Sequence, residues 1–228
     1  MNSSKFLLVL MTSALFSCSN ENDVIYSCDE STDLWVKKHI EEIHSMTRAD
    51  WLNVDDKVKI ASFRAFTNEQ KRTFWEDKIS ETLKLDWNNM EREHIMKLSE
   101  FIETHSDFFE VSRLTEEQDD ELEIFFYKWL RYSLDVLHWD KQVVYAITCT
   151  GYSLKNTIGE LNILTSSINN VEKLTNSSEN QTQPDCNCKL DHLFSCFAGN
   201  DECKDIDCDE GLGCGWLLLQ TCTGKCGF

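Results

Sequence analysis

The segment CNCKLDHLFSCFAGNDECKDIDCDEGLGCGWLLLQTCTGKCGF, residues 186–228, decides how this chain of 228 residues is divided. It holds eight of the eleven cysteines, at Cys186, Cys188, Cys196, Cys203, Cys208, Cys214, Cys222 and Cys226. Such a density is typical of a disulfide scaffold, because a module this small buries too little surface to fold unaided. We therefore expect four disulfides within residues 186–228, although the spacing does not tell which cysteines pair.

Metal binding is the alternative role for so many cysteines. Structural zinc modules usually carry Cys-x2-Cys pairs, and this segment contains none. The acidic residues 205–211 suggest a calcium loop, but its sixth position is Glu210 and its twelfth is Trp216. An EF-hand needs Gly and Glu there. We predict no metal and no cofactor; no catalytic motif occurs, so we do not expect an enzyme.

A polar linker precedes the Cys-rich module. Residues 175–185 contain nothing that can build a hydrophobic core, and they end beside Pro184, the chain's single proline. Such a composition is typical of a solvated connection. The near absence of proline also favours helices in the rest of the chain, because proline is the commonest helix breaker.

The region 34–174 is predicted to be a helical domain. Apolar residues recur at three- and four-residue steps in 34–46 and again in 55–66, which indicates amphipathic helices. From Lys141 to Leu174, leucine and isoleucine positions continue the same period and predict one long last helix. The fold class is therefore mainly α: a helical-bundle-like N-terminal domain followed by a small disulfide-rich module.

Local signals mark where several of these helices begin. Thr67 is followed three residues later by Gln70, and Thr115 by Gln118. This spacing is a capping box, in which each side chain satisfies the backbone N–H of the other residue. We also expect Asp86 to cap the helix that lies between these two.

The start of the chain has the features of an export signal. Lys5 precedes an apolar run over residues 6–16, which is too short to cross a membrane as a helix. Leu15-Phe16-Ser17-Cys18 resembles the lipobox of bacterial lipoproteins. That resemblance implies a signal peptide over 1–17, lipid attachment at Cys18 and a polar tether over 18–33. It implies a lipid-anchored protein of the outer membrane or cell surface; the alternative is a secreted protein in which Cys18 is an ordinary thiol.

Cys28 and Cys149 remain outside the module. They form either a further disulfide or two unpaired thiols, and the sequence leaves both alternatives open.

The charge of the chain restricts its partners. Forty acidic residues against 22 basic ones give a net charge of −18, which argues against binding to nucleic acid or to anionic lipid. The module itself carries seven acidic and three basic residues. A protein or another surface target is the partner that we expect.

Two blocks of this chain resemble the fulvocin C-related bacteriocin family, whose members carry an export signal, a helical N-terminal region and a Cys-rich end. One block comprises Cys186-Asn187-Cys188 and Cys214-Gly215-Trp216, and the other is FRAFTNEQKRTFWEDK at residues 63–78. The resemblance implies a bacteriocin-like lipoprotein and assigns no catalytic residues.

Two functions follow from these observations. In the first, the Cys-rich module is an antagonistic effector that recognises a surface target and is released by cleavage in 175–185. In the second, the chain is a surface lipoprotein with a non-toxic adhesion or binding module. The residues Trp216, Leu217, Leu218 and Leu219 are either an apolar contact surface or the module's own small core, and we favour the core.

Overall fold

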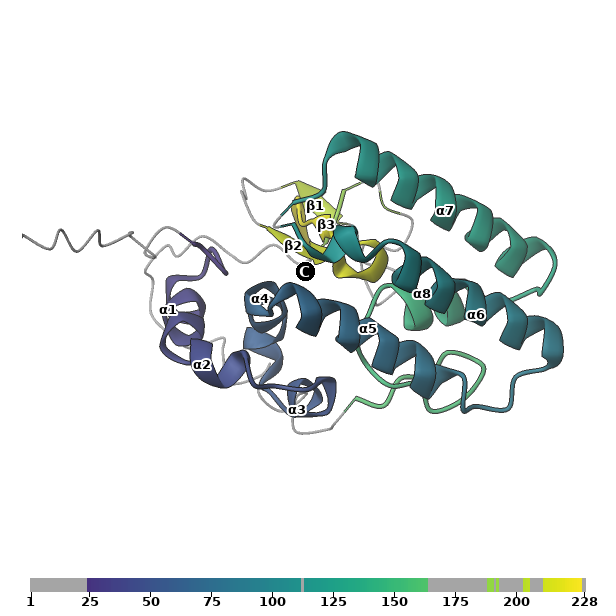
Figure 1. Cartoon of the computed structure of the whole chain (residues 1–228), viewed down its shortest axis with the longest axis horizontal. Coiled ribbons are helices and arrows are strands. Elements are labelled where there is room, and N and C mark those ends of the chain that lie inside the picture. Colours follow the sequence, from purple (N-terminus) through teal and green to yellow (C-terminus); the bar gives the residue numbers. More distant parts are fainter. Residues whose placement is uncertain are drawn as a thin grey trace, which may run out of the picture.

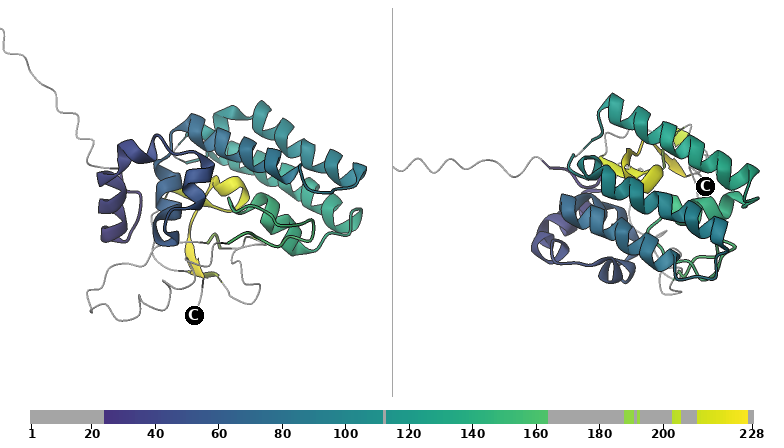
Figure 2. Two further views of the ribbon diagram at one scale, coloured as in Figure 1. Left: turned by 90° about the horizontal axis from the view of Figure 1, so that it is seen from below. Right: turned by 45° about the vertical axis from the view of Figure 1, so that its right-hand side comes forward.

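The computed structural model describes residues 24–111, 113–163, 188–190, 192, 203–205 and 211–226. It is mainly helical with a small disulfide-linked C-terminal part, as the sequence predicts. Figures 1 and 2 show one part of the C-terminal segment, in yellow, lying among the helices, while the left view of Figure 2 shows another part of it projecting below them. The linker at 175–185 lies outside the described residues, as does Cys18.

The N-terminal part consists of four short helices. They are α1 (Glu30–Lys38), α2 (Ile40–Ile43), α3 (Arg48–Leu52) and α4 (Asp56–Ala65). The prediction of a tether as far as residue 33 is wrong at its end, because the Asp29 side chain caps α1 by accepting from the Thr32 N–H at 2.8 Å. The single helix predicted over 34–46 is broken at His39, and α3 was not predicted.

The long helices begin at capping boxes. Thr67 with Gln70 opens α5 (Asn68–Thr82), and Thr115 with Gln118 opens α7 (Glu116–Asp135), as predicted. Between them lie α6 (Asn89–Thr104) and the 3₁₀ helix η2 (Ser106–Phe109). The cap of α6 is Asn88 and not Asp86, because only Asn88 has a Glu three residues later that completes the box.

Helix α8 (Lys141–Thr148) is much shorter than the predicted helix over 141–174. After Cys149 the chain turns back on itself, and Leu154 pairs with Leu161 in an antiparallel bridge. Gly159 has a φ of 84°, and a Cβ there would lie 2.8 Å from the Val143 backbone nitrogen. The leucine spacing therefore fits a turn that packs on α8 as well as it fits a helix. Residues 164–174 lie outside the described part.

The described residues of the C-terminal part contain four short strands. β1 (Cys203–Asp205) pairs antiparallel with β4 (Gly224–Cys226), and β2 (Leu212–Cys214) pairs with β3 (Gln220–Thr221). The turn between β2 and β3 is the 3₁₀ helix η4 (Trp216–Leu218). Gly215, with a φ of 63°, enters this turn where a Cβ would overlap the Gln220 side chain.

One hydrophobic core joins the two parts of the chain. It contains helical residues such as Phe74, Phe126 and Val144 together with Leu212 and the whole run from Trp216 to Leu219. Leu217 and Leu218 adopt positive φ values of 51° and 56°, which is unfavourable for residues with a Cβ. Burial of both side chains offsets that cost, since they are 0% and 4% exposed.

Candidate functional site

The C-terminal segment docks on the helices through Trp216. Its indole is 3% exposed and stacks on Phe126 of α7 with the ring centroids 4.5 Å apart and the planes 3° apart. The indole Nε1 donates to Glu123 Oε2 at 3.1 Å. The interpretation of Trp216–Leu219 as a core internal to residues 186–228 is therefore wrong, because these residues belong to the core of the helical domain.

Two carboxylates of α7 hold the polar rim of this contact. The Gln220 amide donates to Asp119 Oδ1 and to Glu123 Oε1, both at 2.8 Å. Its oxygen accepts from the Trp216 N–H at 3.1 Å, so Gln220 also fixes the turn. Lys189 Nζ lies 3.5 Å from Asp119 and 3.6 Å from Glu123. Asp119 and Glu123, two acidic residues of α7, therefore bind the C-terminal segment of the same chain.

Arg64 of α4 joins three separate segments. Its Nε donates to the Leu212 carbonyl at 2.8 Å, and its Nη1 donates to the Tyr26 carbonyl at 2.9 Å. Its Nη2 lies 3.4 Å from Cys222 Sγ. A guanidinium suits this position because its fork of fixed donors reaches several acceptors at once.

The structure pairs four of the predicted cysteines. Cys188 is bonded to Cys203, and Cys214 is bonded to Cys222. Cys186, Cys196 and Cys208 lie outside the described residues, and the Cys226 side chain is likewise not described. Disulfides are compatible with an extracytoplasmic protein.

Cys149 is a free thiol at the end of α8, so the bridge with Cys28 that the sequence left open is not formed. Burial raises the pKa of the Cys149 thiol to about 12. The thiolate is the nucleophilic form of cysteine. A thiol that stays protonated is not suited to covalent catalysis.

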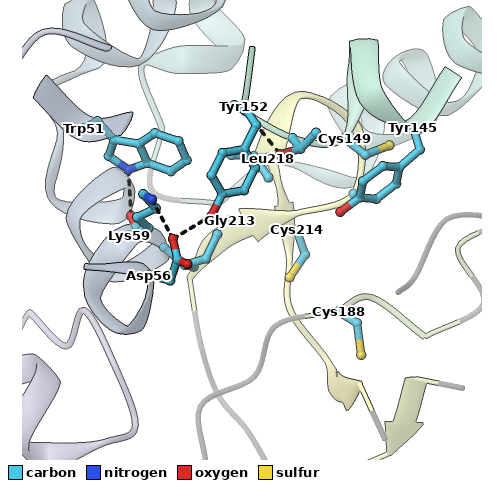
Figure 3. A pocket seen from close by; sticks show the side chains of 14 residues that line it. Trp51, Asp56, Lys59, Tyr145, Cys149, Tyr152, Cys188, Gly213, Cys214 and Leu218 are labelled. Carbon is cyan, nitrogen blue, oxygen red and sulfur yellow. Dashed lines mark hydrogen bonds and ion pairs between the residues drawn. The ribbon is translucent and has the colours of Figure 1, made fainter. Parts of the chain in front are cut away.

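A cavity of about 180 Å³ lies where the C-terminal segment meets the helical domain (Figure 3). We call it the junction cavity. Its walls come from residues 51–60, from residues 145–152 and from residues 213–218 with Cys188. Three aromatic side chains line it, namely Trp51, Tyr145 and Tyr152. These positions are far apart in the sequence, and no spacing pattern would have brought them together.

An ion pair between a buried lysine and a partly exposed aspartate lies at one end of the junction cavity. The Lys59 side chain is 4% exposed, and its Nζ lies 2.5 Å from Asp56 Oδ1. The Tyr152 hydroxyl donates to the same carboxylate oxygen at 2.7 Å. Burial raises the pKa of Tyr152, and the hydrogen bond to Asp56 raises it further, so the phenol remains a donor. The ammonium lies 4.9 Å from the Tyr152 ring centre and 5.6 Å from that of Trp51.

A second polar network fixes the wall at residues 151–153. Arg48 Nε donates to the Gly151 carbonyl at 2.9 Å, and Arg48 Nη2 donates to Ser153 Oγ at 3.0 Å. Arg48 also pairs with Glu81 at 2.5 Å. The buried Lys78 ammonium donates to the Tyr152 carbonyl, and burial together with the Arg48 charge holds the pKa of Lys78 well below its usual range. These contacts fix the backbone on both sides of Tyr152 and thereby the position of its ring.

Metal-binding groups and membrane-spanning helices are both absent from the described part of the chain. No group of three or more His, Cys, Asp or Glu side chains in that part of the chain is placed to hold a metal ion. No helix in it is both long and apolar enough to cross a membrane.

Comparison of the chain with protein-family models, with curated proteins and with solved structures finds no match. The resemblance to the fulvocin C-related family therefore stays a prediction.

Proposed function

We propose that this chain is an exported lipoprotein of the cell envelope, anchored through Cys18, which binds a surface target as one folded unit. The observation that carries the proposal is the position of Trp216, Leu217, Leu218 and Leu219 within the core of the helical domain. A module that acts after release would lose this core. This arrangement supports a binding protein in which the helical and Cys-rich parts act as one folded unit.

Two other observations support export. The disulfides Cys188–Cys203 and Cys214–Cys222 fit an oxidising compartment. The apolar run at residues 6–16 followed by Cys18 fits a lipoprotein signal.

Antagonism of other bacteria is the second candidate, and the two blocks that resemble the fulvocin C-related family favour it. In this fold, release of residues 186–228 would expose Trp216 and remove the Leu212 carbonyl that accepts from Arg64. An antagonistic action would therefore belong to the whole chain. Its net charge of −18 favours a surface protein over anionic lipid as the target.

The first experiment tests whether the chain is one unit. A protease site is placed within residues 175–185, the purified chain is cut there, and the product is analysed by size-exclusion chromatography with the disulfides intact. We expect one peak that contains both pieces. A non-reducing denaturing gel shows that no disulfide joins them. Separation of the pieces in native buffer would contradict the proposal.

The second experiment separates the two functions. A soluble chain that begins at Ser19 is labelled and added to intact bacterial cells, and the same preparation is spotted on bacterial lawns. Saturable binding without clearing supports a binding protein, and clearing supports the bacteriocin-like function. If the chain neither binds to nor clears any strain of a broad panel, both candidates are refuted.

A further inference from the structure

Helix α7 presents an exposed face that has two apolar side chains at its centre. Ile124 is 56% exposed and Tyr127 is 64% exposed. Figure 1 and the right view of Figure 2 show α7 along the outer edge of the molecule. Steps of three, four and seven residues share one side of a helix. The exposed residues at these steps form what we call the α7 face, namely Glu117, Asp120, Ile124, Tyr127, Lys128 and Arg131.

The charges of the α7 face are separated by sign along the helix. Both acidic residues precede Ile124, and both basic residues follow it. The helix macrodipole favours acidic residues only in the first turn and basic residues only in the last. Asp120 lies beyond the first turn, and the last turn of α7 contains no basic residue. The macrodipole therefore does not account for Asp120, Lys128 or Arg131.

The helix itself does not neutralise its two cations well. A carboxylate four residues before a cation makes the favourable pair within a helix, but Ile124 and Tyr127 occupy those positions before Lys128 and Arg131. Arg131 instead contacts Asp135 at 2.6 Å, and the two side chains are 61% and 50% exposed, so this pair contributes little. Among the described residues, Lys128 has no ion pair. Both cations therefore remain available to a partner.

The spacing of the charges is symmetric about Ile124. Glu117 lies seven residues before Ile124 and Arg131 seven after it, which is about 10.5 Å along the helix in each direction. Asp120 lies four residues before Ile124 and Lys128 four after it, about 6 Å in each direction. In an antiparallel pair of these helices centred on Ile124, every acid of the α7 face lies at the height of a base of the second copy.

The same pattern disfavours other arrangements. A parallel pair would place each charge opposite the same charge, which is repulsive. The antiparallel pair has a two-fold axis at Ile124, so that one patch binds itself, as in isologous dimers. Tyr127 then lies opposite Glu121 of the second copy. Glu121 already contacts His105 at 3.3 Å, so this position adds contact area and no ion pair.

We propose that the α7 face binds the α7 face of a second copy of this chain in antiparallel orientation. About four turns of one helix cover less than the roughly 800 Å² per partner of a standard interface, so the dimer is weak, with a Kd of about 0.1–1 mM. At micromolar concentrations the chain is a monomer. The net charge of −18 adds a repulsion between copies, but physiological salt screens it beyond about 8 Å.

Sedimentation equilibrium of the soluble chain that begins at Ser19 tests the proposal, at physiological salt and up to about 1 mM. We expect a reversible increase in mass towards that of a dimer. A chain that stays monomeric, or one that associates beyond a dimer, would overturn the proposal. The dimer goes beyond the proposed function and does not depend on it, because the experiment needs neither the lipid nor a target.

Reversal of the charges tests the assigned pairs. An acidic variant carries Lys128→Glu with Arg131→Glu, and a basic variant carries Glu117→Lys with Asp120→Lys. Each alone should associate at least tenfold more weakly than the wild type. A mixture of the two should associate at least as tightly as the wild type, because all four acids then lie opposite bases. If each variant alone dimerises as the wild type does, or if the mixture does not associate, the proposal is wrong.

A matched control separates these pairs from the effect of overall charge. Lys84→Glu with Lys155→Glu makes the same change in net charge as the acidic variant does, at exposed positions outside α7. It should dimerise as the wild type does. Equal weakening in this control would show that net charge and not the α7 face governs the association.

Cysteine cross-linking tests the orientation and does not depend on the charge variants. A disulfide forms only where the two Cα atoms lie within about 7 Å. The two Ile124 residues meet at the axis, whereas the two Glu117 residues lie about 21 Å apart along an antiparallel pair. Under mild oxidation with glutathione, Ile124→Cys should form covalent dimers beyond the wild-type level and Glu117→Cys should not. No cross-link at Ile124→Cys, or an equal cross-link at Glu117→Cys, would overturn the proposed arrangement.

Discussion

Replacement of Trp216 by Ala should destabilise the helices, although this residue lies in the Cys-rich part. The indole is 3% exposed, and a buried Trp removes about 150–250 Å² from water. At about 25 cal/mol per Å², this area corresponds to roughly 4–6 kcal/mol as an upper limit. Measured Trp-to-Ala costs in cores are about 3–5 kcal/mol. We expect a loss of about 4 kcal/mol in the free energy of unfolding, a large share of the roughly 5–15 kcal/mol of a typical domain.

Urea unfolding measures this loss. It is followed by circular dichroism of the helices, without reducing agent, so that the disulfides stay intact. Trp216→Phe should cost only about 2 kcal/mol, because it keeps a ring on Phe126 and loses the hydrogen bond to Glu123. Tyr127→Ala, on the exposed side of α7, should change stability by less than about 0.5 kcal/mol.

The reasoning is refuted if the helices of Trp216→Ala unfold at the same urea concentration as those of the wild type. That result would mean that residues 211–226 fold apart from the helical domain. It would also restore the interpretation of Trp216–Leu219 as a core internal to the Cys-rich module, and with it the release of that module as an effector.

Three further changes test other parts of the fold. Lys71→Met should raise the free energy of unfolding at pH 7 by about 1–3 kcal/mol, because burial lowers the pKa of Lys71 to about 8 and the native state must bury its charge. Between pH 8 and 10.5 the unfolded chain holds the extra proton, so the wild type should gain stability there in urea titrations and the variant should not. Burial lowers the pKa of His94 to about 4, below its usual 6.5, so the unfolded chain takes up a proton first as the pH falls. Stability should decrease by about 3 kcal/mol from pH 6.5 to 4, and an equally steep decrease in His94→Gln would contradict this assignment. Arg64→Met should cost about 2–4 kcal/mol and speed amide exchange in β2, because the Leu212 and Tyr26 carbonyls lose their donors; unchanged exchange would show that Arg64 does not hold β2.

The sequence predicted the parts of the fold that depend on near neighbours. The capping boxes at Thr67 and Thr115 were found because both partners lie within one helical turn. Asp86 was predicted as a cap because aspartate commonly caps helices, whereas the structure uses Asn88, which forms a capping box with Glu91. The end of α8 was missed, since a period of three and four residues does not exclude a turn closed by Gly159.

The contacts that make the candidate site depend on distant partners. Trp216 and Glu123 are 93 residues apart, and Tyr152 and Asp56 are 96 apart. A single sequence offers no spacing rule for such pairs. The one local indication was the apolar run 216–219, and the sequence allowed it to belong to either part of the chain.

The charge distribution shows which force holds the C-terminal part in place. Residues 186–228 carry seven acidic and three basic residues, yet the described part of this segment packs on the acidic helix α7. Overall charge therefore opposes this docking. The contact forms nevertheless, because Gln220, the Trp216 indole and Lys189 supply donors to Asp119 and Glu123. Burial of Trp216–Leu219 supplies most of the favourable free energy. A contact held mainly by buried apolar surface resists salt, so ionic strength alone should not detach the C-terminal part from the helices. We therefore expect the helical and C-terminal parts to stay one folded unit at low and at high salt.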